Sequence, residues 1–86
     1  MTVDQIKQKT QAVVLEMLPG VSSEELSDDR DIFSLGLDSV NAMNLIFGLQ
    51  DAFEIQFATS EISFENFRTV SGIVELIKRK QEELQW

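Results

Sequence analysis

The chain has no cysteine, no histidine and no tyrosine among its 86 residues. Without cysteine it forms neither disulfides nor thiolate nucleophiles, and without histidine it lacks the most frequent general base and a common metal ligand. A catalyst made from this chain would have to act through carboxylates and hydroxyls alone. We therefore expect a protein that has no catalytic residues of its own.

Positive charge is also scarce, since seven Lys and Arg residues face fifteen Asp and Glu residues and give a net charge of −8. Such a chain lacks the basic patch that nucleic acids and anionic lipids require, so its charged partners should be basic. No apolar run is long enough to span a membrane, and the first residues lack the apolar core of a signal peptide. We expect a soluble, cytoplasmic monomer.

The acidic residues are concentrated in the middle of the chain, where Arg30 is the only cation between Thr10 and Phe67. One interpretation is that acidic loops simply keep a small protein soluble. The other is that they form a docking surface for basic partner enzymes. Composition favours the two about equally.

The length is that of one small domain, residues 1–86, which is too small to hold a deep enzyme cleft. Thr2 and Gln5 have the spacing of a capping box, and apolar residues follow at helical spacing until Pro19-Gly20 ends the first helix. Segment 20–38 is acidic and contains large apolar residues that would not stay in water, so we expect a long packed loop. These residues are Leu26, Ile32, Phe33, Leu35 and Leu37.

A second helix is expected over 39–53, and it is apolar around most of its circumference. Helical spacing predicts a core face of Val40, Met43, Ile46, Phe47 and Phe53, widened by Ala42, Leu45 and Leu49. The narrow polar stripe that remains consists of Asn41, Asn44, Gly48 and Asp51.

The remaining sequence predicts one extended connector and two further helices. Segment 54–57 alternates like a strand but is too short to stand alone, so we expect a connector. Ser63 can cap a short helix that carries Phe64 and Phe67, and Thr69 can cap a last helix with Val70, Ile73, Val74 and Ile77 on one face. The expected fold is all-α, a small four-helix bundle of three main helices and one short helix. We expect Trp86 to fray at the end of the chain.

Gly36-Leu37-Asp38-Ser39-Val40 brings a serine to the first turn of the second helix. Such a serine most often only caps the helix. Asp38 is an equally good cap, however, which leaves Ser39 for another purpose, and the helix N-terminus has unpaired N–H groups and partial positive charge that suit a phosphate. As an enzymatic nucleophile Ser39 is weak, because no histidine exists to activate it.

The succession of these motifs resembles the acyl carrier protein family over nearly the whole chain. The residues that carry the resemblance are 31–40 (Asp-Ile-Phe-Ser-Leu-Gly-Leu-Asp-Ser-Val), the apolar helix that follows, Phe53-Glu54-Ile55, and Phe67-Arg68-Thr69-Val70. The resemblance implies a free-standing carrier with 4′-phosphopantetheine attached to Ser39 and no bound metal. The thiol of this arm, which holds acyl groups as thioesters, supplies the one that the sequence lacks.

The resemblance also implies partners. A Mg²⁺-dependent phosphopantetheinyl transferase would attach the arm from coenzyme A and recognise Asp38, and acyl- or aminoacyl-loading enzymes and downstream synthases or transferases would act on the cargo. These enzymes should meet the exposed side of the second helix, through the candidate docking residues Leu37, Val40, Asn41, Asn44 and Asp51.

Two departures from the family pattern bear on the pathway. Val40 stands where the family usually has Leu, and the second helix lacks most of the acids that carriers of fatty-acid synthesis have. We therefore expect a carrier of a specialised polyketide or mixed peptide–polyketide pathway, with an aminoacyl carrier or a fatty-acid carrier as alternatives. Docking should depend on hydrogen bonds and apolar contact more than on ion pairs.

Two other classes of protein are alternatives to a carrier. A calcium-binding loop from Asp28 is disfavoured, because it lacks the required glycine and its twelfth position is Ser39. A helical protein-interaction domain without a covalent cofactor is the stronger rival, because small acidic bundles often only bind.

Overall fold

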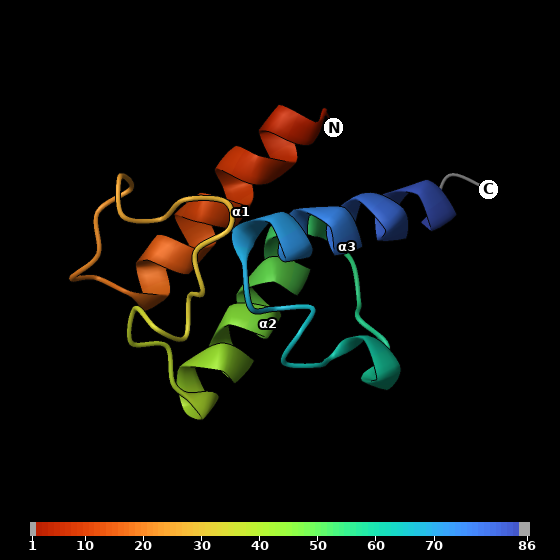
Figure 1. Cartoon of the computed structure of the whole chain (residues 1–86). Helices are drawn as coiled ribbons and strands as arrows, with labels where there is room; N and C mark the ends of the chain where they lie inside the picture. The colour runs from red at the N-terminus through yellow and green to blue at the C-terminus, as the bar shows by residue number, and fades with distance from the viewer. Residues whose placement is uncertain (1, 85–86) are drawn as a thin grey trace.

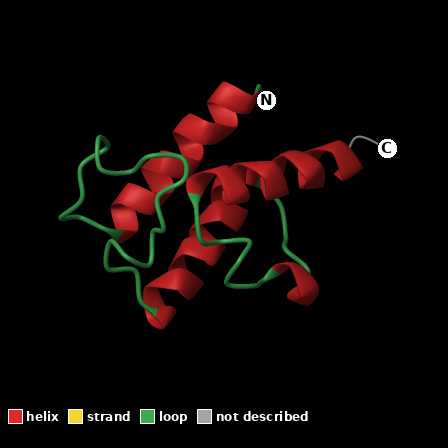
Figure 2. Ribbon diagram, viewed as in Figure 1, coloured by secondary structure: helices red, strands yellow, loops and turns green. Residues whose placement is uncertain are grey.

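The computed structural model describes residues 2–84, so the expectation for Trp86 lies outside the described residues. Three helices, α1 (Val3–Met17), α2 (Ser39–Phe53) and α3 (Val70–Leu84), form the fold together with a 3-10 helix, η1 (Thr59–Glu61) (Figure 1). Only helices and loops occur in this part of the chain (Figure 2), which confirms the all-α prediction. No helix within residues 2–84 has the length and apolar character to cross a membrane.

Helix α1 begins at the predicted capping box. The Gln5 N–H donates to the Thr2 hydroxyl at 3.2 Å, and the Thr2 N–H donates to the Gln5 side chain at 2.9 Å. The helix ends at Met17, just before Pro19-Gly20. It packs against both α2 and α3 through its buried face, which comprises Ile6, Thr10, Val13 and Val14.

The predicted core face of α2 is partly wrong. Leu45, Ile46, Leu49 and Phe53 are buried, whereas the side chains of three expected core residues are exposed: Val40 by 72%, Met43 by 44% and Phe47 by 54%. A helix that is apolar nearly all round fits more than one rotation about its axis, so its periodicity does not decide which side is inside.

Gly48 lies on the side of α2 that faces α1. It was expected on the outer polar stripe, but a Cβ atom there would lie 3.2 Å from the Val13 side chain. The missing side chain therefore lets α2 approach α1 closely at this position. With Gly48 turned towards α1, the side chains of Val40, Met43 and Phe47 are turned outwards.

The loop between α1 and α2 is packed, as predicted. Leu26, Ile32 and Leu37 are buried in it. Two backbone hydrogen bonds attach it to the start of α3: the Ile32 N–H donates to the Arg68 carbonyl at 2.9 Å and the Ser71 N–H to the Asp28 carbonyl at 3.0 Å. Two ion pairs hold it from the outside, Lys7–Asp28 at 2.9 Å and Arg68–Asp31 at 3.1 Å.

The segment between α2 and α3 differs from its prediction in two details. Residues 55–57 form an irregular connector, and the Phe57 N–H donates to the Gln50 side chain at 3.0 Å. The expected connector was wrong at Glu54, which has a φ of 55° and ends α2 in a left-handed conformation. The short helix expected from Ser63 is only a turn, in which the Ser63 hydroxyl accepts from the Asn66 N–H at 3.2 Å and the Ser63 carbonyl from the Phe67 N–H at 3.3 Å. The regular short helix is η1, which ends just before this turn.

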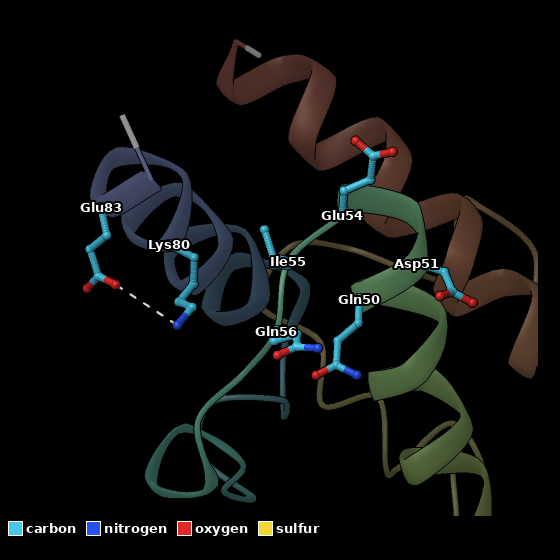
Figure 3. Close-up of a pocket in the computed structure, with 7 residues that line it drawn as sticks. All are labelled: Gln50, Asp51, Glu54, Ile55, Gln56, Lys80 and Glu83. Atoms are coloured by element: carbon cyan, nitrogen blue, oxygen red, sulfur yellow. Dashed lines mark ion pairs between the residues drawn. The ribbon is translucent and has the colours of Figure 1, made fainter. Parts of the chain in front are cut away.

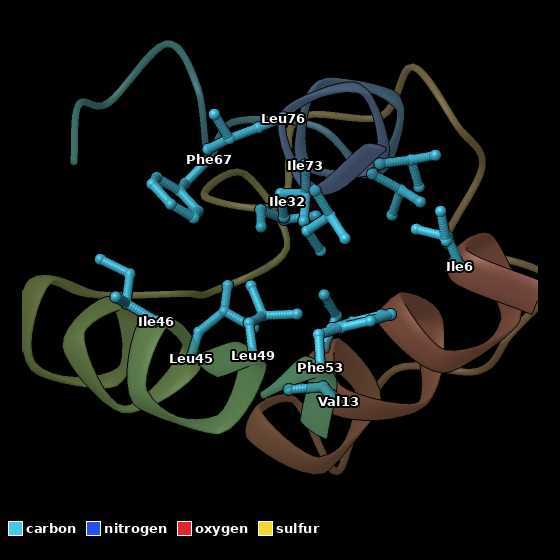
Figure 4. Close-up of a cluster of buried hydrophobic side chains, with 14 of the residues drawn as sticks. Ile6, Val13, Ile32, Leu45, Ile46, Leu49, Phe53, Phe67, Ile73 and Leu76 are labelled. Atoms are coloured by element: carbon cyan, nitrogen blue, oxygen red, sulfur yellow. The ribbon is translucent and has the colours of Figure 1, made fainter. Parts of the chain in front are cut away.

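The core lies where the three helices and the first loop meet (Figure 4). Thr69 caps α3, as predicted, by accepting from the Gly72 N–H at 3.0 Å. All four residues predicted on the inner face of α3 are buried, together with Leu76. Among these apolar side chains lies the Thr10 hydroxyl, which is fully buried and has no hydrogen-bond partner within the described residues.

Replacing Thr10 by valine should raise the free energy of unfolding by about 1 kcal/mol, because a buried hydroxyl without a partner costs free energy that a methyl group does not. Val and Thr have similar shapes and similar helix propensities. Urea denaturation of the wild type and the variant measures the difference. Thr10→Ala is the control and should be less stable than Thr10→Val, because it leaves a cavity. A loss of stability in Thr10→Val would contradict the assignment of an unpaired hydroxyl.

Glu61 attaches η1 to α3 and should make this attachment sensitive to acid. Its carboxylate accepts from the Ala58 N–H at 2.7 Å and from the Lys80 ammonium at 3.0 Å. These two interactions, the backbone hydrogen bond first, hold the pKa of Glu61 below its ordinary value. Because the folded-state pKa is the lower one, the stabilisation is complete above the ordinary value of 4.5 and is lost as the pH falls through the folded-state pKa.

The variant Glu61→Gln should therefore be less stable than the wild type at neutral pH, and the difference should shrink as the pH falls below 4.5. Urea titrations at neutral and acid pH measure the two differences. Glu65→Gln, at an exposed position of the same segment, is the control for loss of a negative charge. A stability difference for Glu61→Gln that stays constant with pH would contradict this account.

Candidate functional site

Ser39 is the first residue of α2, as the sequence predicts, and the structure shows that it is exposed. The cap of this helix is Asp38, whose carboxylate accepts from the Asn41 N–H at 2.8 Å and whose carbonyl accepts from the Ala42 N–H at 2.8 Å. No hydrogen bond among residues 2–84 involves the Ser39 hydroxyl. The capping function therefore belongs to Asp38, and the Ser39 hydroxyl is available to another molecule.

The turn before Asp38 is built around Ile32 and Gly36. The Ile32 carbonyl accepts from the N–H groups of Leu35 and Leu37, at 3.2 and 3.4 Å. Gly36 has a φ of 113°, a backbone conformation that residues with a Cβ atom rarely adopt. Leu37 then enters the core with only 4% of its surface exposed. This anchor fixes the position of Asp38 and Ser39.

Burial corrects one of the predicted docking residues. Leu37 does not reach the surface, so its side chain supports the loop and cannot contact a partner. Val40, Asn44 and Asp51 are exposed and Asn41 is half-buried. The prediction missed Met43 and Phe47, which are exposed on the same helix. Their spacing from Val40, three and seven residues, is the signal that places them on the same exposed face of the helix.

Ser39 lies at the edge of an apolar pocket of about 220 Å³. Met43 and Ile46 line it from α2, and Ile62, Phe64 and Phe67 line it from the segment after η1, with Phe33, Ala42 and Ser63 completing the wall. The Phe33 and Phe64 rings stack with their centroids 4.5 Å apart, so the loop before α2 meets the segment after η1 here. None of these lining side chains titrates, so the pocket wall offers no base to activate Ser39.

A larger hollow of about 590 Å³ lies between the last turn of α2 and α3 (Figure 3). Its walls hold charges of both signs, including Asp51 from α2, the C-cap residue Glu54, and the Lys80–Glu83 pair, 4.0 Å apart, from α3. Ser39 is not part of its wall. It also has no hydroxyl or thiol side chain, so it offers no attachment point for a covalent group.

The surroundings of Ser39 fit a phosphate ester. The side chain is an exposed primary hydroxyl at the start of a helix of fifteen residues. Backbone N–H groups in the first turn of a helix lack intrahelical acceptors, and the helix dipole adds partial positive charge, so both favour a phosphate at this end. The apolar pocket beside the hydroxyl gives the neighbouring part of an attached group a surface to contact.

Residues 11–77 match the model of the family described as "phosphopantetheine attachment site". The chain therefore belongs to this family of carrier proteins, whose members bear a covalently attached 4′-phosphopantetheine. It is 37% identical over 71 residues to the D-alanyl carrier protein of Streptococcus uberis, covering 79% of this chain and 90% of that protein. With the D-alanyl carrier protein of Lactobacillus acidophilus it shares 34% identity over 77 residues, or 86% of this chain and 98% of the relative.

An aminoacyl carrier protein of Agrobacterium fabrum is 26% identical over 55 residues, which cover 64% of this chain and 66% of that protein. Among solved structures, the chain resembles one in the crystal structure of the Bradyrhizobium japonicum glycine:[carrier protein] ligase complexed with its cognate carrier protein. The TM-score is 0.78 and the identity 20%, over 86% of this chain and 96% of that one. This likeness confirms the carrier fold.

Proposed function

We propose that the protein is an aminoacyl carrier whose 4′-phosphopantetheine arm is attached to Ser39. The observation that carries the proposal is the exposed Ser39 hydroxyl, which takes no part in capping because Asp38 performs that function. The arm supplies a thiol that holds the amino acid as a thioester. The protein holds the cargo and presents it, and partner enzymes perform the chemistry.

The relatives favour amino acids over polyketide or fatty-acid intermediates as cargo. The similar proteins are named D-alanyl and aminoacyl carrier proteins, so the aminoacyl alternative replaces the polyketide carrier as our preferred interpretation. The scarcity of charge on the exposed side of α2, where Asn44 lies and Asp51 is the one charged residue, argues against a fatty-acid carrier and is compatible with both an aminoacyl and a polyketide carrier. It distinguishes the chain from carriers with an acidic second helix.

The proposal requires at least two partner enzymes. Because the pocket wall holds no base, a phosphopantetheinyl transferase must activate Ser39. It forms the bond between the Ser39 oxygen and the pantetheine phosphate, breaks the pyrophosphate bond of coenzyme A, and releases adenosine 3′,5′-bisphosphate and the hydroxyl proton. A ligase then activates the amino acid with ATP, releasing pyrophosphate, and transfers the aminoacyl group from the adenylate to the thiol of the arm, releasing AMP. Both enzymes must approach the start of α2, where Val40, Asn41 and Asn44 surround the attachment site and Asp51 follows further along the helix.

Incubation with coenzyme A, Mg²⁺ and a broad-specificity phosphopantetheinyl transferase should add one phosphopantetheine group to each chain. Ser39→Ala should fold as the wild type does, because Asp38 still caps α2, and should gain no mass. Intact-mass spectrometry measures the addition. The other serines are unchanged in Ser39→Ala, so they serve as internal controls. Modification of Ser39→Ala would disprove the site, and an unmodified wild type would favour the non-carrier interaction domain.

We expect the transferase to recognise Asp38, which also caps α2, and two substitutions separate these two functions. Asp38→Asn keeps a good N-cap but removes the charge, whereas Asp38→Ala removes both and should cost about 1 kcal/mol of stability. We expect both variants to be modified several-fold more slowly per folded molecule than the wild type, although only Asp38→Ala melts at a lower temperature. Rates and melting curves together test this. If Asp38→Asn is modified at the wild-type rate, Asp38 has only a structural function.

A further inference from the structure

The hollow between the end of α2 and α3 has a net negative charge on its wall (Figure 3). Three carboxylates line it, those of Asp51, Glu54 and Glu83. The cation in the same wall is Lys80, whose ammonium lies 3.0 Å from the carboxylate of Glu61, a residue outside the wall. Asp51 and Glu54 form no ion pair within the described residues. The hollow therefore has the charge to bind a further cation.

The backbone at the end of α2 adds to this negative potential. The carbonyl groups in the last turn of a helix lack intrahelical partners and give that end a partial negative charge, which favours a nearby cation. The last turn of α2 contains no basic residue. The hollow thus lies at the negative end of the helix whose positive end begins at Ser39.

Ser39 and the hollow lie along one face of α2. Ser39, Met43 and Ile46 line the apolar pocket, and Gln50 and Glu54 line the hollow. These residues follow one another at spacings of four, three, four and four, so they share one side of the helix. At 1.5 Å a residue, the stretch from Ser39 to Gln50 is about 17 Å long.

A loaded arm has the length and the charges to follow this face. About seventeen atoms lead from the Ser39 oxygen to the amino group of an attached amino acid, and an extended chain of that size spans about 20 Å. The phosphate of the arm would lie at the positive end of α2, and the α-ammonium of the aminoacyl group at its negative end. A fatty acyl cargo has no such second charge.

We propose that the hollow binds the α-ammonium of the aminoacyl group on the arm, and that Asp51 and Glu54 form the ion pairs with it. This inference rests on the proposed function, because the arm brings a cation to the hollow only with an aminoacyl cargo. The tether gives the cargo an effective concentration of the order of millimolar, so weak ion pairs at an exposed site suffice. The carboxylates favour the charged amine, which is not a nucleophile while it is protonated.

The test compares two forms of the protein that differ only by this ammonium. A phosphopantetheinyl transferase attaches the arm from coenzyme A analogues that bear an alanyl or a propionyl group through an amide, which resists hydrolysis. The backbone amide NMR signals of Gln50, Glu54 and Glu83 should differ between the two forms. With a ¹³C-labelled alanyl group, the pKa of the ammonium should be at least about 0.5 above that of the same alanyl-phosphopantetheine group free in solution.

One pair of substitutions separates the hollow from the general negative charge of the chain. Glu54→Gln should remove half or more of the rise in the pKa of the ammonium and reduce the signal differences. Glu24→Gln is the matched control, because it removes the same charge from an exposed position in the loop before α2 that does not line the hollow. It should leave both readouts nearly unchanged.

The outcomes distinguish this inference from the proposed function. Intact mass after the transferase reaction shows whether the arm is attached, and that result does not depend on the hollow. With the arm attached, an unshifted pKa and identical signals in the two forms would overturn the ammonium site alone. Signal differences confined to Met43 and Phe64 would also overturn it, because the cargo would then lie in the apolar pocket. Equal losses in Glu54→Gln and Glu24→Gln would make the net charge of the chain the cause and overturn it as well.

Discussion

The burial of Ile32 is the constraint on which the position of the candidate site depends. Its side chain is fully buried, its N–H donates to the Arg68 carbonyl, and its carbonyl accepts from both Leu35 and Leu37. One residue thus joins the long acidic loop to the start of α3 and also forms the turn that leads into α2. Together with the buried Leu26 and Leu37, this anchor holds the loop from which Asp38 and Ser39 begin α2.

The two sides of α2 have different functions in this account. The inner side packs into the core through residues such as Leu45 and Leu49, and Gly48 allows the close contact with α1. The outer side exposes apolar surface next to the attachment site. In the proposed function, the same short helix would stabilise the fold, present Ser39 and be approached by partner enzymes. A basic binding patch would be difficult to combine with this surface, since α2 contains no Lys or Arg.

Sequence patterns predicted those features that depend on neighbouring residues. The capping box at Thr2, the cap at Asp38 and the buried face of α3 follow from local spacing, and the structure confirms them. The inner face of α2 could not be predicted in the same way, because an almost wholly apolar helix has no preferred side until α1 and α3 are in place. The pocket beside Ser39 also escaped prediction, because Phe33 and Phe64 come from segments far apart in the sequence.

The central claim is that Ser39 carries the arm and that the arm carries an amino acid. The most direct measurement is peptide mass spectrometry of the protein purified from its native host under conditions that preserve thioesters. The account predicts a phosphopantetheine ester on the peptide that contains Ser39, with an aminoacyl group that hydroxylamine releases as its hydroxamate, leaving the free thiol of the arm. A native protein whose Ser39 peptide is entirely unmodified, or whose arm carries only fatty or polyketide acyl groups, would contradict the account.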